Sequence, residues 1–162
     1  MKRHPSLVPV SREHQRGLFL AQALKRGIPR YKNLPTTHEG KREYALSVYK
    51  ALLQDHFHAE ETILFPAIRG SDNEIDTLID ELLQEHQQMH TMFQTLPTTP
   101  DLETQLHELG MLLEAHIRKE ERQLFERVQV VIDEDQLHTL GQNLATYQNR
   151  ISAKSHNFDT EK

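Results

Sequence analysis

Hydrophobic residues recur along most of this chain at intervals of three and four, the spacing that places side chains on one face of an α-helix. No stretch shows the sustained alternation of apolar and polar residues, bounded by turn residues, that is typical of a β-strand. The pattern predicts an all-α fold class, namely an antiparallel up-and-down four-helix bundle with short connections between neighbouring helices. The predicted helices cover residues 11–27, 37–68, 73–96 and 99–132.

Capping and turn residues define the ends of these helices. Ser11 and Thr99 are suitable N-caps because their hydroxyl groups can accept a bond from a free backbone N–H. Gly70 supplies a stop for the second helix, and Pro29 cannot continue the first. The bundle is therefore expected over about residues 11–132.

A fifth amphipathic stretch follows the bundle. Its apolar residues fall on one helix face and are Leu137, Leu140, Leu144, Tyr147 and Ile151. This pattern predicts an additional C-terminal helix over about residues 133–152, packed outside the bundle or against a second subunit. Residues 153–162 carry no apolar period and are expected to form a mobile tail. The 162 residues together are expected to form a single domain.

The chain contains an internal repeat. Leu52-Leu53-x-x-His56-x-x-x-Glu60-Glu61 matches Leu112-Leu113-x-x-His116-x-x-x-Glu120-Glu121, and Glu13-His14-Gln15 matches Glu85-His86-Gln87. Two equivalent pairs of helices explain this agreement most simply.

Composition limits the chemistry. With no cysteine the chain can form neither a disulfide nor a thiolate metal site, so a bound metal must have nitrogen and oxygen ligands. The net charge is −5 and acids and bases are mixed along the chain, so no nucleic acid partner is expected. No segment has the apolar run of a signal peptide or a membrane span, so we expect a soluble, cytoplasmic protein with no membrane partner.

Four histidines share one setting, because an apolar residue stands one helical turn before each of them. They are His14, His56, His86 and His116, preceded four positions earlier by Val10, Leu52, Leu82 and Leu112. One helical turn after these histidines stand, in the same order, Leu18, Glu60, His90 and Glu120, each four residues after its histidine. A buried imidazole without a partner costs about 1–3 kcal/mol, so four of them at one level indicate a metal site.

The predicted ligands are His14, His56, Glu60, His86, His90, His116 and Glu120. One ion cannot use all seven, whereas two ions bridged by both carboxylates can. Iron, which accepts six ligands rich in imidazole and carboxylate, is preferred to manganese or to tetrahedral zinc. His86, His90 and His116 would hold one ion, and His14 and His56 the other, which keeps an open position. The remaining histidines, and Glu61 and Glu121, are interpreted as surface residues.

As a set, these motifs resemble the hemerythrin-like, or HHE cation-binding, domain family over roughly residues 11–132. The resemblance rests on His14, on His56-Phe-His-Ala-Glu60-Glu61, on Glu85-His86-x-x-x-His90 and on His116-Ile-Arg-Lys-Glu120-Glu121. It implies a four-helix bundle with a non-haem di-iron centre that binds dioxygen or related diatomic molecules.

The chain also departs from the family pattern. Oxygen-carrying members place an Asp five residues after the last histidine, where this chain has Glu121, which makes Glu121 a rival to Glu120 as the bridging ligand. Members proposed to repair iron centres use four histidines and two glutamates and often carry a cysteine-containing domain. Neither subgroup can therefore be assigned from the sequence.

Three functional classes stay open. The first is binding of dioxygen, nitric oxide or peroxide at an open iron position, for sensing, storage or delivery. The second is an enzyme that reduces peroxide or nitric oxide, and the third is an iron store or donor. The sequence leaves open the oligomeric state, with a homodimer as one option.

Overall fold

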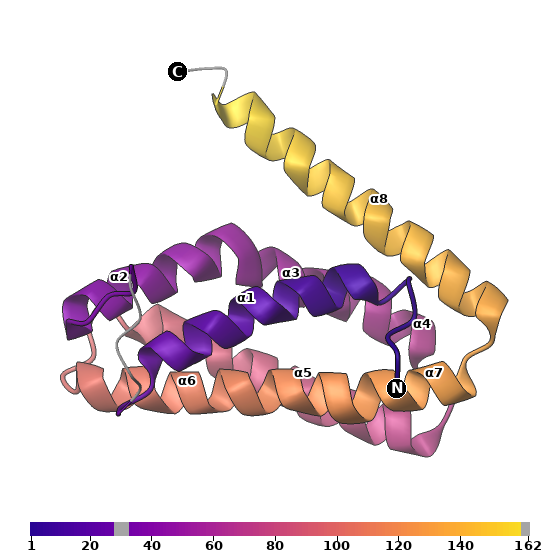
Figure 1. Ribbon diagram of the computed structural model, residues 1–162, viewed down its shortest axis with the longest axis horizontal. Helices are drawn as coiled ribbons and strands as arrows, with labels where there is room; N and C mark the ends of the chain where they lie inside the picture. The colour runs from indigo at the N-terminus through magenta and orange to yellow at the C-terminus, as the bar shows by residue number, and fades with distance from the viewer. Residues whose placement is uncertain (28–32, 160–162) are drawn as a thin grey trace.

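Helices are the regular elements of the computed structural model, which describes residues 1–27 and 33–159, with side chains as far as residue 155. No strand occurs within those ranges, and the all-α prediction is confirmed. Four helical stretches lie side by side, and a fifth leaves them at one end (Figure 1). We call the first four stretches the bundle. The predicted stop at Pro29 lies outside the described residues.

The first stretch is α1, Val8–Leu24, which begins three residues before the predicted start at Ser11. Pro9 stands in its first turn, where a missing backbone N–H removes no helical hydrogen bond. The residue after the helix, Lys25, is extended, and Gly27 has a positive φ of 70°.

The second stretch is continuous from His38 to Ile68, as predicted, but its geometry changes along its length. Thr37 caps it by accepting a bond from the Gly40 N–H. Two π-helical turns interrupt the α-helix; the successive elements are α2 (His38–Val48), η1 (Tyr49–Leu53), α3 (Gln54–Ala59), η2 (Glu60–Leu64) and α4 (Phe65–Ile68). Gly70, with φ of 85°, follows and allows the turn that ends the stretch.

The third and fourth stretches start at aspartate caps. Asp72 accepts bonds from two backbone N–H groups of α5, Asn73–Thr95, and Asp101 accepts one from Thr104 at the start of the fourth stretch. The fourth stretch consists of α6 (Leu102–Lys119), the π-helical turn η3 (Glu120–Leu124) and α7 (Phe125–Val131). It starts later than the predicted cap at Thr99 because Asp101 takes that role.

The fifth stretch, α8 (Glu134–Asp159), crosses η2 and α3 and then separates from the bundle (Figure 1). Leu137, Leu140 and Leu144 bury its first half against the bundle, as their spacing predicts. The helix continues past the predicted end near residue 152. No glycine or proline lies between residue 152 and the end of the helix at Asp159, and the Ser155 hydroxyl donates to the Ile151 carbonyl.

Two hydrophobic clusters fill the bundle, and a polar layer separates them. One cluster includes Val10, Leu64, Leu82 and Leu124, and the other includes Leu20, Leu53, Met89 and Leu113. On every stretch the buried histidine lies between residues of the two clusters. The core is therefore apolar at both ends and ionisable in the middle.

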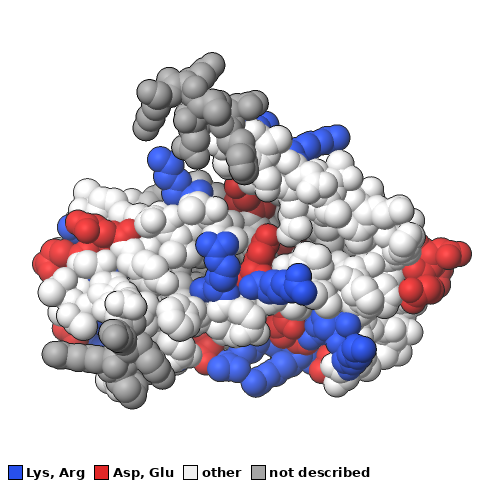
Figure 2. Space-filling model, turned by 45° about the horizontal axis from the view of Figure 1, so that its top comes forward, with Lys and Arg blue, Asp and Glu red and all other residues white. Residues whose placement is uncertain are grey.

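The surface carries charges of both signs. Lys and Arg side chains lie beside Asp and Glu over the face shown in Figure 2. Among the described residues, none of the helices combines the length and the apolar character that a bilayer-spanning helix requires.

Close packing of α1 on α6 depends on Gly110. A Cβ atom at Gly110 would lie 2.8 Å from the carbonyl oxygen of Ala21 and 3.2 Å from the Cβ of Leu24. Backbone atoms cannot move aside as a flexible side chain can, so a larger residue must push the two helices apart.

We expect Gly110→Leu to lower the free energy of unfolding by about 1–3 kcal/mol, because overpacking outweighs the better helix propensity of leucine. Met111→Leu is the matched control, since Met111 is 51% exposed. It should change stability by less than about 0.5 kcal/mol. Urea denaturation measures both, and equal midpoints for the two variants would contradict the packing argument.

Candidate metal centre

Six buried ionisable residues form the polar layer. Each is at most 4% exposed, and they are His14, His56, Glu60, His86, His116 and Glu120. All six were predicted as ligands, and the structure brings them together from four separate helical stretches.

The six residues divide into two groups that share both glutamates. His14 and His56 form one group with Glu60 and Glu120, and His86 and His116 form the other with the same two carboxylates. Within each group the candidate ligand atoms lie within 4.8 Å of one another. This arrangement suits two metal ions with two bridging carboxylates.

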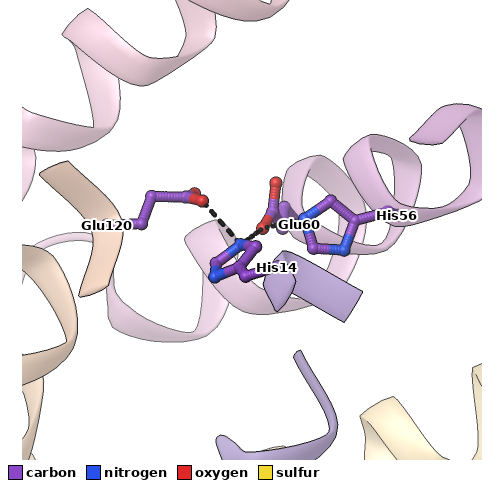
Figure 3. Close-up of side chains that lie close together, drawn as sticks. All are labelled: His14, His56, Glu60 and Glu120. Carbon is purple, nitrogen blue, oxygen red and sulfur yellow. Dashed lines mark hydrogen bonds and ion pairs between the residues drawn. The ribbon is translucent and has the colours of Figure 1, made fainter. Parts of the chain in front are cut away.

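In the first group the Nε2 atoms face the carboxylates. His14 Nε2 lies 2.9 Å from Glu120 Oε2 and 3.4 Å from Glu60 Oε1, and His56 Nε2 lies 2.9 Å from the same Glu60 oxygen. Figure 3 shows these side chains converging.

The second group repeats this geometry. His86 Nε2 lies 3.2 Å from Glu60 Oε2, and His116 Nε2 lies 3.6 Å from Glu120 Oε2. The two Nε2 atoms are 3.1 Å apart. All four histidines thus direct Nε2 into the layer.

Carboxylate oxygens without a well-formed hydrogen bond indicate that a cation fits here. Glu60 Oε2 and both side-chain oxygens of Glu120 are buried and accept no hydrogen bond of good geometry, although His86 Nε2 lies 3.2 Å from Glu60 Oε2 and His14 Nε2 lies 2.9 Å from Glu120 Oε2. A buried acceptor left in this way costs about 1–3 kcal/mol, and more if it is charged. Metal ions at the centre of each group would satisfy these oxygens and the inward imidazole nitrogens together.

A second ring of carboxylates surrounds the first. The Nδ1 atom of each of the four histidines lies within hydrogen-bond distance of a glutamate. The pairs are His14 with Glu121 at 2.6 Å, His56 with Glu13 at 2.6 Å, His86 with Glu61 at 2.8 Å and His116 with Glu85 at 2.7 Å. An outer carboxylate of this kind fixes the ring orientation of a metal-binding histidine and strengthens it as a ligand.

The interpretation of Glu61 and Glu121 as surface acids was wrong. Their side chains are only 34% and 23% exposed and each binds a histidine of another helix. The internal repeat could have indicated this role, because Glu13-His14 recurs as Glu85-His86 and Glu60-Glu61 recurs as Glu120-Glu121. Helical periodicity considers one helix at a time and could not reveal these contacts.

The geometry distinguishes Glu120 from Glu121 as the candidate ligand shared by both groups. Glu120 lies in both ligand groups, whereas Glu121 binds His14 from outside. The π-helical turns η2 and η3 begin at Glu60 and Glu120, where the chain must direct two successive glutamates to different histidines. π turns inside α-helices are frequent at functional sites.

Proline does not explain these turns. Pro66 follows η2, but the equivalent position after η3 is Glu126 and the turn still forms. The shared feature is the glutamate pair.

The outer carboxylates have unequal partners. Arg3 lies 2.7 Å from Glu121, Lys119 lies 2.5 Å from Glu85, and the Gln148 amide donates to Glu13 at 3.0 Å. Burial favours protonation of Glu121, but hydrogen bonds from His14 and Ser11 outweigh it and lower its pKa to about 2.

The carboxylates also favour protonated histidines. Burial opposes the charged form of His56, but the charge of Glu60 and the hydrogen bond to Glu13 raise its pKa to about 9. Burial likewise opposes protonation of His86, and bonds to Glu60 and Glu61 raise its pKa to about 9. Without a metal, protons therefore occupy the cluster at neutral pH.

His90 is the one predicted ligand that the structure does not bring into either group. Its Nδ1 atom forms a short hydrogen bond with the Tyr49 hydroxyl instead. One helical turn beyond His86, its ring lies level with the second apolar cluster, beside Phe57.

Comparison with known proteins supports this description of the site. The family model described as the hemerythrin HHE cation binding domain matches residues 10–128. A DNA nickase from Nostoc sp. is 29% identical over 97 residues, which are 59% of this chain but only 27% of that protein. The chain thus spans much less than half of that relative. No solved structure gives a significant match.

Metal uptake should release protons at neutral pH. Ligating imidazoles must be neutral, whereas His56 and His86 hold their protons up to about pH 9 in the metal-free fold. Apparent metal affinity should therefore rise as the pH increases toward 9 and fall as the cluster is protonated at lower pH. A pH indicator in weakly buffered protein measures the release; uptake without release would contradict the assignment.

We expect Glu85→Gln to weaken metal binding about 10- to 100-fold, because it removes the carboxylate from Nδ1 of His116. Glu81→Gln is the matched control, since Glu81 contacts the same Lys119 but no histidine of the cluster. Competition with a chelator measures both affinities. Equal weakening would show that the loss of the lysine partner, rather than the histidine contact, matters.

Proposed function

The chain belongs to the hemerythrin family of HHE cation-binding domains, and on this premise we propose that its polar layer holds two iron ions that react with small oxygen or nitrogen species. The observation that carries the proposal is the pair of four-residue groups that share Glu60 and Glu120. Dioxygen, peroxide and nitric oxide are the candidate ligands.

Iron is chosen for the chemistry of the donors. Each group offers two imidazole nitrogens and two carboxylate oxygens and no sulfur, a set that iron accepts with further positions left open. Manganese could use the same donors, and zinc could use four of them in a closed tetrahedral site. Bound iron would supply electrons to a small molecule at those open positions.

The number of ligand side chains at each ion position favours a reaction with the small molecule over reversible carriage of dioxygen. Four side chains reach each ion position, and His90, which would have added a fifth on one side, is held by Tyr49. If only these four side chains held each ion, positions would stay open at which a peroxide could bind and be reduced. Reduction of peroxide or nitric oxide is therefore our first choice, and carriage of dioxygen our second.

The protein itself controls the surroundings of the layer. Phe57 lies 4.3 Å from the ring of His86, and Phe125 stacks on His14 with 5.7 Å between ring centroids. These apolar rings keep bulk water away from the inner nitrogens, so charges in the layer interact through a low dielectric. The outer carboxylates hold each imidazole in one orientation.

DNA nicking is not carried over from the relative. The aligned segment is 27% of that protein, and the face in Figure 2 mixes basic with acidic side chains, without the basic stripe typical of nucleic acid binding.

Absorption spectra of reduced, iron-loaded protein test the reaction class. After peroxide is added, we expect lasting oxidation of the iron and stoichiometric loss of peroxide. A new band formed in air that disappears when dioxygen is removed would instead indicate carriage, and loss of iron from the protein would indicate storage or donation.

Elemental analysis tests the ligand assignment. We expect two iron ions per chain, and loss of at least one in His56→Ala, because His56 supplies an inward nitrogen to the first group. His58→Ala is the matched control, two residues away and exposed, and should keep the full content. One tightly bound zinc in iron-replete protein would contradict the di-iron proposal.

A further inference from the structure

A hydrogen-bonded tyrosine and histidine lie beside the polar layer, outside the ligand groups. Tyr49 is 9% exposed, and its hydroxyl forms a short hydrogen bond with His90 Nδ1. Its ring stacks on Phe93, with centroids 4.1 Å apart and planes 10° from parallel. The pair therefore combines an oxidisable phenol with a base in a shielded position.

The internal repeat shows that packing alone does not require this pair. Tyr49 stands seven residues before His56, and the equivalent position before His116 is Leu109. His90 stands four residues after His86, and the equivalent position after His14 is Leu18. The other half of the bundle thus fills the same places with leucines, which need no hydrogen bond.

The two halves of the bundle also differ in helix geometry at this position. The π-helical turn η1 begins at Tyr49, whereas the equivalent part of α6 is regular α-helix. The turns η2 and η3 begin at Glu60 and Glu120, the two glutamates that both groups share. Because such turns are frequent at functional sites, η1 marks Tyr49 as a position with a role of its own.

A chain of aromatic rings joins the pair to the layer. The ring of His86 lies 4.3 Å from Phe57, Phe57 lies 5.6 Å from His90, and His90 lies 5.7 Å from Tyr49, measured between centroids. Electrons move readily across contacts this short. Tyr49 is thus connected to a proposed iron ligand without touching the ligand groups.

On the basis of the proposed iron centre, we propose that Tyr49 is a redox-active tyrosine that donates one electron to the centre and its proton to His90. In this step the Tyr49 O–H bond breaks, and a neutral phenoxyl radical and a protonated His90 form. Peroxide is the oxidant. It takes one electron from Tyr49 and one from the iron pair, takes two protons from solvent, and leaves as two water molecules.

Glu61 supports the step electrostatically. Its carboxylate binds His86 Nδ1 and also acts on both His90 and Tyr49. Burial lowers the pKa of His90, and the negative charge of Glu61 opposes this effect, so it favours the imidazolium that His90 becomes.

Electron paramagnetic resonance of frozen, iron-loaded protein tests the proposal. After peroxide is added, we expect a tyrosyl signal that narrows when the protein contains ring-deuterated tyrosine. Tyr49→Phe should abolish the signal and keep the iron content. Tyr44→Phe, a partly buried tyrosine on the same helical stretch, is the matched control and should keep the signal.

His90→Leu places the residue of the other half at this position and removes the proton acceptor. It should also lose the signal while it retains two iron ions. If iron is bound and peroxide is consumed but no tyrosyl signal forms, or if the signal persists in Tyr49→Phe, the inference is overturned and the proposed function stands. If His90→Leu loses iron, His90 is a ligand and the role given to the pair is wrong. Failure of the natural chain to bind iron would defeat the proposed function itself.

Discussion

Burial of two carboxylates and four imidazoles in one layer of the core is the constraint on which the rest of the structure depends. Removing such groups from water costs several kcal/mol for each ion unless charges and hydrogen bonds are paired. Apolar clusters on both sides of the layer prevent solvent from providing that pairing. The residues around the layer must therefore provide it, and three oxygens of Glu60 and Glu120 still remain for a cation.

The four outer carboxylates provide this pairing in the same way for each inward histidine. Their own partners, in contrast, differ from one carboxylate to the next. Every inward histidine has one glutamate on Nδ1, supplied by the neighbouring residue of another ligand. Beyond that ring, Arg3 and Lys119 neutralise two of the four glutamates, and Gln148 of α8 binds a third. The N-terminal segment and the C-terminal helix are thus connected to the site by single side chains, which gives regions outside the bundle a physical influence on it.

Much of the site could be predicted because its residues repeat. Helical spacing placed the four histidines and two glutamates on apolar faces, and the structure brings all six together. The same reasoning assigned Glu61 and Glu121 to the surface, although each binds a histidine across the bundle. Spacing relates a residue to neighbours on its own helix, so it cannot detect a contact that depends on how two helices are rotated against each other.

The sequence by itself determined the all-helical fold class, the approximate helix ends and the inner residues, because periodicity, capping and burial are local properties of the chain. Only the tertiary structure decided which carboxylate each histidine Nδ1 meets, since Glu61 and Glu121 bind histidines of other helices. It also decided the position of His90. That imidazole lies one turn beyond His86, where the nearest polar group is the Tyr49 hydroxyl of another helix, and no rule of spacing could have identified this partner.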